Sequence, residues 1–169
     1  AILHNLGKTQ EAFDSYRKTI EISPEISNNY SIITRFLKDA NISEINCEDL
    51  RLIVDLLLFR KDVRHQDLFK AVDFLYNKDL LTKLEMCENN LINEKLFLPL
   101  INDRLLKNAL KKIIFRDMKW EKLLTKLRYD ICMSLTSEEV LINDSKLEFI
   151  ISLAEQCFLN EFVFKKSNE

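Results

Sequence analysis

The sequence predicts an all-α fold, and three observations support this prediction. The chain of 169 residues contains one Gly and two Pro, far fewer turn residues than strand-rich folds require. Apolar residues recur at the i, i+3, i+4, i+7 spacing of an amphipathic helix along most of the chain. Alternating strand patterns are absent from the sequence, and only residues 96–100 and 140–142 are ambiguous. We therefore expect a helical hairpin followed by an array or bundle of about six further helices.

The first predicted element is a helical hairpin around the single glycine, Gly7. A short apolar stub precedes Gly7, and an amphipathic run over residues 11–22 follows it. Glycine adopts at low cost the left-handed backbone conformation that commonly ends helices. Ser23 and Pro24 close the run, because proline cannot continue a helix.

Five residues of this hairpin have a specific spacing, in which small, aromatic and proline positions follow the glycine in a fixed order. They are Gly7, Ala12, Tyr16, Thr19 and Pro24. This pattern resembles the second half of a tetratricopeptide repeat (TPR), a unit of about 34 residues. The resemblance implies that Ala12 and Thr19 lie where paired helices approach closely, with the aromatic ring of Tyr16 between them. Thr19 replaces the usual alanine, so its hydroxyl needs a hydrogen-bond partner.

The TPR resemblance covers residues 1–24 and implies that more chain belongs before residue 1. A complete repeat has roughly eight further residues ahead of Ala1, and a lone repeat cannot bury its apolar face. We therefore expect the sequence to be a piece of a longer protein, with stacked repeats before it.

A third helix is predicted to begin at Pro24. Ser23 is expected to be its N-cap, with proline at the first helical position. Three apolar residues then share one face of the predicted helix: Tyr30, Ile33 and Leu37. We expect this helix to cap the repeat array.

The polar loop over residues 41–46 marks the expected domain boundary. Residues 1–40 would form the partial TPR hairpin with its capping helix. Residues 41–169 would form a helical connector domain.

Five apolar stripes with helical spacing follow this loop, and residues 80–86 are also expected to be helical. The stripes are Leu50, Ile53, Val54, Leu57 and Leu58; Leu68, Phe69, Val72, Leu75 and Tyr76; Ile101, Leu105, Ala109, Leu110 and Ile113; Trp120, Leu123, Leu124, Leu127 and Ile131; and Leu147, Ile150, Ile151, Ala154, Cys157 and Phe158. We expect Asn46 or Cys47 near the start of the first of these helices. The last helix is expected to start with a capping box formed by Ser145 and Glu148.

Charge and hydropathy exclude several classes of partner. The net charge is −2, so no global field attracts the chain to nucleic acid or to a membrane surface. The longest apolar runs, over residues 56–59 and 96–100, are far too short to span a bilayer.

The four cysteines are far apart in the sequence, and none belongs to a C-x-x-C motif. They are Cys47, Cys87, Cys132 and Cys157. The spacing of zinc ligands is therefore absent. We expect buried or half-buried free thiols in a reducing compartment, and hence a cytoplasmic location.

The sequence predicts no catalytic, cofactor or metal site. His65 lies in the densest polar cluster, over residues 59–69, where a histidine beside an aspartate is a candidate base. No serine or cysteine nucleophile is near it in the sequence, and we expect this cluster to be an interhelix loop. One glycine cannot supply the glycine-rich turn of nucleotide or S-adenosylmethionine sites.

A basic stretch over residues 104–128 is the candidate contact for an anionic partner. The residues proposed for that contact are Lys107, Lys111, Lys112 and Arg116. Trp120 lies on an apolar stripe, so we expect it in the core. Because acidic residues dominate the region from 138 to 161, an alternative is that the basic and acidic regions face and compensate each other.

The residues of the final block are similar to those of a known helical region. Leu105–Leu110, Leu123–Arg128 and above all Ala154–Phe164 resemble the region between the TPR array and the catalytic domain of bacterial TPR-containing S-adenosylmethionine-dependent methyltransferases. The polar cluster over residues 59–69 is also similar. The resemblance implies that the methyltransferase domain follows residue 169, so no catalytic residue transfers to this chain.

The expected function is therefore a noncatalytic α-helical scaffold that binds a protein or peptide partner and holds it near the missing catalytic domain. Five residues would contact that domain: Asn160, Glu161, Phe162, Val163 and Phe164. Alternatives are a stand-alone interaction module, another TPR fusion such as a glycosyltransferase, or a binder of an anionic partner through the basic stretch.

Overall fold

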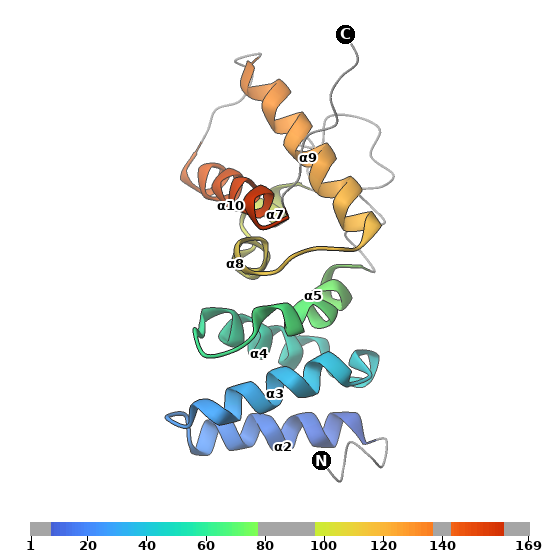
Figure 1. Cartoon of the computed structure of the whole chain (residues 1–169), viewed down its shortest axis with the longest axis vertical. Coiled ribbons are helices and arrows are strands. Elements are labelled where there is room, and N and C mark those ends of the chain that lie inside the picture. Colours follow the sequence, from blue (N-terminus) through green and yellow to red (C-terminus); the bar gives the residue numbers. More distant parts are fainter. Residues whose placement is uncertain (1–7, 78–96, 137–142, 161–169) are drawn as a thin grey trace. The chain divides into compact units, whose positions relative to one another are not determined.

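The computed structural model describes residues 8–77, 97–136 and 143–160, and these residues form eight α-helices and two 3-10 helices without a strand (Figure 1). The predicted all-α fold is confirmed. The α-helices are α2 (Thr9–Ile22), α3 (Ser27–Asp39), α4 (Cys47–Phe59), α5 (Phe69–Tyr76), α7 (Phe97–Ile101), α8 (Arg104–Lys112), α9 (Met118–Thr136) and α10 (Asp144–Asn160). The 3-10 helices are η1 (Ile42–Glu44) and η2 (His65–Leu68).

The chain divides into two compact units, unit 1 over Ala1–Tyr76 and unit 2 over Asn77–Glu169. The polar loop over residues 41–46, where the sequence predicts a boundary, lies inside unit 1 and contains η1. Predictions for Gly7, residues 80–86, residues 140–142 and Cys87 fall outside the described residues.

In unit 1, α2 and α3 lie side by side as a helical hairpin (Figure 1). The residue at the N-cap position of α3, Ile26, makes no side-chain hydrogen bond to the start of the helix. The sequence predicts that the third helix starts at Pro24, but α3 begins at Ser27. The reason is that Ser23 ends α2, since its backbone N–H donates to the Thr19 carbonyl. Pro24 follows in the turn, where its carbonyl accepts a hydrogen bond of 2.9 Å from the Tyr30 hydroxyl.

The residues of the TPR pattern take different positions on α2. Ala12 is buried, and the ring of Tyr16 packs against Phe36 of α3 with 5.1 Å between centroids. Thr19 is exposed, and its hydroxyl donates to the Ser15 carbonyl at 2.8 Å. The hydroxyl thus finds its partner within α2 itself.

The helix α4 has the predicted start and the predicted core stripe. Asn46 is its N-cap, and the side-chain oxygen of Asn46 accepts from the backbone N–H groups of Glu48 and Asp49. This arrangement satisfies two donors that a helix start leaves without intrahelical partners. All five stripe residues are buried: Leu50, Ile53, Val54, Leu57 and Leu58.

The first two described helices of unit 2, α7 and α8, lie where the sequence contains one ambiguous segment and one long apolar stripe. The ambiguous residues around Pro99 form the short helix α7. The stripe expected from Ile101 to Ile113 is interrupted, because Asp103 caps a new helix, α8, by accepting a hydrogen bond from the Leu106 N–H.

The core of unit 2 contains the single tryptophan. Trp120 of α9 is 1% exposed, and its ring centroid lies 4.6 Å from that of Phe115. The expectation that Trp120 belongs to the core is confirmed. The remaining stripe residues of α9 are also buried: Leu123, Leu124, Leu127 and Ile131.

The last helix, α10, starts earlier than the predicted capping box. Asn143 precedes the helix, and its side-chain oxygen accepts a hydrogen bond of 2.9 Å from the Lys146 N–H. Ser145 lies inside the helix, so it does not cap it. Glu148 does not turn back to the helix start but pairs with Lys107 of α8.

Candidate functional site

The polar cluster around His65 lies between α4 and α5, and His65 is the first residue of η2. The Arg60 guanidinium lies over the ring of Tyr30, 3.9 Å from its centroid. Arg60 also donates to both carboxylate oxygens of Asp62, through Nε at 2.8 Å and Nη2 at 2.5 Å. The His65 Nε2 lies 2.8 Å from the Arg60 carbonyl oxygen. These contacts hold the connection against α3.

The charges in this connection are fixed by their neighbours. Hydrogen bonds from Arg60, and then from the Ser27 hydroxyl, hold the pKa of Asp62 well below its usual range. The hydrogen bond to Asp62 in turn raises the pKa of the Arg60 guanidinium. A carboxylate with its pKa lowered in this way stays ionised, so it is suited to a structural ion pair and not to proton transfer. The arrangement agrees with an interhelix loop, as the sequence predicts.

Within residues 8–77, 97–136 and 143–160, no group of three or more His, Cys, Asp or Glu side chains is placed to hold a metal ion. The described cysteines form no disulfide, but Cys47 and Cys132 are exposed and only Cys157 is half-buried. The prediction of buried or half-buried thiols is therefore wrong for Cys47 and Cys132.

Some basic side chains of residues 104–128 make contacts within unit 2. Lys107 is 8% exposed, and its ammonium pairs with the Glu148 carboxylate of α10. The hydrogen bond from Lys107 is the main cause that lowers the pKa of Glu148, and the charge of Lys111 adds to it. Lys111 and Lys112 are half-buried, and Arg116 is exposed. The Lys107–Glu148 pair is a case of the internal compensation that the sequence offers as an alternative.

Arg128, the last residue of the basic stretch, is also turned inward. Its side chain is buried, with Nη1 3.1 Å from the Cys157 Sγ of α10 and Nη2 3.3 Å from the Thr125 hydroxyl. Two basic side chains of the stretch therefore contact α10. The helix α10 is also the element that carries Asn160, the first residue of the predicted interdomain contact, at its end. The other four predicted contact residues, Glu161 to Phe164, lie outside the described residues.

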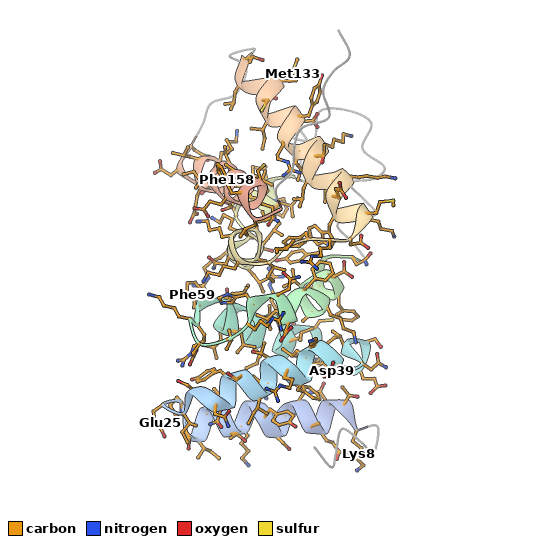
Figure 2. All side chains as sticks on the ribbon, in the orientation of Figure 1. Lys8, Glu25, Asp39, Phe59, Met133 and Phe158 are labelled. Atoms are coloured by element: carbon orange, nitrogen blue, oxygen red, sulfur yellow. The ribbon has the colours of Figure 1, made fainter. Side chains whose placement is uncertain are left out.

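The orientation of α10 is the feature that sequence reasoning missed. Its buried residues are Phe149, Ser152, Leu153 and Gln156. Four residues of the predicted apolar stripe are instead exposed, and we name them the α10 seam: Leu147, Ile151, Ala154 and Phe158. Phe158, labelled in Figure 2, is 86% exposed. Two polar side chains are thus buried while larger apolar ones face outward.

The burial pattern of α10 opposes the usual hydrophobic preference. Leaving a large apolar side chain exposed forgoes about 1.5–3 kcal/mol relative to burying it. An exposed row of such side chains on one helix is typical of a surface that binds another macromolecule. The sequence signal was present, because α10 has apolar residues on more than one face, but periodicity alone does not say which face is inside.

A second exposed apolar row lies on α4. Leu52, Leu56 and Phe59 follow one another at the spacing of a helix face, and Leu52 is 70% exposed. Figure 2 labels Phe59 at the end of this helix. Each unit therefore has an outward apolar row of its own.

Comparisons with known proteins give no independent assignment. No family model, no curated protein and no solved structure matches this chain. No helix of the described residues combines the length and apolar character needed to cross a bilayer. Among the described residues, the exposed apolar rows on α4 and α10 are the features typical of a binding surface.

Proposed function

We propose that this chain is a noncatalytic α-helical scaffold that binds protein partners through exposed apolar helix faces. The observation that carries the proposal is the α10 seam, which turns Leu147, Ile151 and Phe158 outward while Ser152 and Gln156 are buried. Protein partners are favoured because helix faces of this kind are commonly covered by other helices or domains. The exposed row on α4 supports the same function for unit 1.

We further propose that the chain is the region between TPR repeats and the catalytic domain of an S-adenosylmethionine-dependent methyltransferase. The resemblance of residues 154–164 to that region supports this, as does the buried position of Ala12. The exposed position of Thr19 does not add support. In such a protein the scaffold would hold a bound partner close to the active site, and so raise the local substrate concentration.

The coding sequence on both sides of the chain tests this context. A strand followed by a glycine-rich turn downstream of Glu169 supports the methyltransferase. A glycosyltransferase domain there supports the other TPR fusion, and a stop codon supports a stand-alone interaction module. Further repeats upstream of Ala1 would support the TPR assignment.

The docking of the downstream domain tests the scaffold itself. We expect that domain, produced separately, to bind the 169-residue chain, measured by biolayer interferometry. Deleting Phe162, Val163 and Phe164 should weaken the binding, because apolar surface is lost. Ile22→Ser, at an exposed isoleucine that ends α2, is the matched control and should leave this binding unchanged. Equal binding by all variants would contradict docking at this end of unit 2.

A further inference from the structure

The spacing of the α10 seam is that of a coiled-coil helix. Its members follow one another at intervals of four, three and four residues: Leu147, Ile151, Ala154 and Phe158. These intervals place them at alternating d and a positions of a heptad, which form the contact line between two packed helices. The seam covers about 16 Å of helix at the rise of an α-helix, roughly three turns.

The charges beside the seam are acidic. In this heptad register the e positions, directly next to the contact line, are Glu148 and Glu155. Glu148 is compensated by Lys107, with Lys111 near it. Glu155 is exposed, and no salt bridge to it is found among the described residues. The helix carries Asp144 as a further exposed carboxylate.

We infer that the α10 seam binds one amphipathic helix of a partner protein, and that this helix carries lysine or arginine beside its own apolar line. The inference rests on the proposed scaffold function and names the chemistry of the partner at the same surface. Apolar residues at the a and d positions of the partner would cover Ile151 and Phe158. A basic residue next to them would lie opposite Glu155.

A second copy of this chain does not fit the seam as well. Two antiparallel copies of α10 would bring e positions opposite e positions, so Glu148 and Glu155 would face carboxylates of the same kind. Two parallel copies would place them opposite the g positions, which are Ile150 and Cys157. Neither arrangement supplies a cation to Glu155, whereas a basic partner helix does.

The test uses the 169-residue chain and two synthetic peptides, each of three heptads with leucine at a and d. One peptide has lysine at e and g, and the other has glutamate there. We expect the lysine peptide to bind in a fluorescence anisotropy titration, about tenfold or more tightly than the glutamate peptide. The difference should shrink with rising salt, because the charges are exposed.

Three variants separate the seam from general attraction between opposite charges. Phe158→Ser should weaken binding of the lysine peptide by about tenfold or more, without changing the net charge of the chain. Glu155→Lys should reduce the preference for lysine over glutamate. Ile22→Ser, at an exposed isoleucine that ends α2, is the matched control and should bind as the unchanged chain does. Far-UV circular dichroism verifies that each variant remains helical.

Three results would overturn the inference. Equal binding of both peptides, or no effect of Phe158→Ser, excludes the seam as a site for a basic helix. A concentration-dependent dimer in sedimentation equilibrium that Phe158→Ser abolishes would make a second copy the occupant. Much tighter peptide binding after deletion of residues 161–169 would mean that these residues of the chain occupy the seam. If the peptides fail but deletion of Phe162, Val163 and Phe164 still weakens binding of the downstream domain, the scaffold function stands and only the partner chemistry is wrong.

Discussion

Lys107 and Glu148 form a pair whose two members are unequally exposed. The Lys107 side chain is 10% exposed, and that of Glu148 is 55% exposed. Removing the carboxylate leaves a buried ammonium without its partner, which is strongly unfavourable. Removing the ammonium lets Glu148 return to water. We therefore expect Glu148→Gln to lower the urea midpoint of unfolding more than Lys107→Met does, measured by circular dichroism.

The same pair predicts how stability depends on pH. Since Lys107 lowers the pKa of Glu148 in the folded chain, the carboxylate contributes its full stability above the unfolded pKa of about 4.3. That contribution is lost as the pH falls through the lower folded pKa. The difference in urea midpoint between the unchanged chain and Glu148→Gln should therefore shrink at acid pH. Glu155→Gln, on the same helix, is the control and should show little difference at either pH; a Glu148→Gln difference independent of pH would contradict the pairing.

Arg60 makes two kinds of contact that only a guanidinium combines. It lies over the Tyr30 ring and donates two hydrogen bonds to Asp62. Lysine keeps the charge but cannot reproduce the planar fork. We expect Arg60→Lys to lower the thermal midpoint and to increase hydrogen exchange in residues 60–64. Lys61→Arg, on an exposed neighbour, is the control, and equal behaviour of the two variants would show that the planar geometry is unimportant.

The start of α10 is capped by a different residue in the structure than the sequence predicts. The sequence predicts a cap at Ser145, but the side chain of Asn143 accepts the hydrogen bond from Lys146. Loss of an N-cap side chain costs about 0.5–2 kcal/mol. We expect Asn143→Ala to destabilise by roughly this amount in urea denaturation, and Ser145→Ala to have a much smaller effect. The reverse order would restore the capping box.

Sequence periodicity predicted which segments are helical better than it predicted their ends or their buried faces. The stripes of α4 and α9 are buried as expected, because each helix has one dominant apolar face. The helix α10 differs, since its apolar residues lie on more than one face and its neighbours decide which face is inside. Contacts with α8, including the Lys107–Glu148 pair, join residues 41 positions apart, and local patterns carry no information about such distances. The predicted cap at Ser23 is wrong because Ser23 is the residue that ends α2, and α3 begins only at Ser27.

At the scale of the whole molecule, each of the two units has a buried core of its own. Leu50 and Leu57 are fully buried in unit 1, and Trp120 is buried in unit 2 with Phe115 beside it. The chain contains one tryptophan, so tryptophan fluorescence reports on unit 2, whereas far-UV circular dichroism reports on the helices of both units.

This difference between the two signals makes the independence of the units measurable. Leu50→Ala removes buried apolar volume from unit 1 and should cost about 2–5 kcal/mol there. We expect it to shift part of the circular dichroism transition to lower urea while the fluorescence midpoint stays unchanged. Leu124→Ala in α9 is the matched variant and should shift the fluorescence midpoint instead. If Leu50→Ala moved both signals together, the chain would unfold as one cooperative body, and a partner bound at the α10 seam would then stabilise unit 1 as well as unit 2.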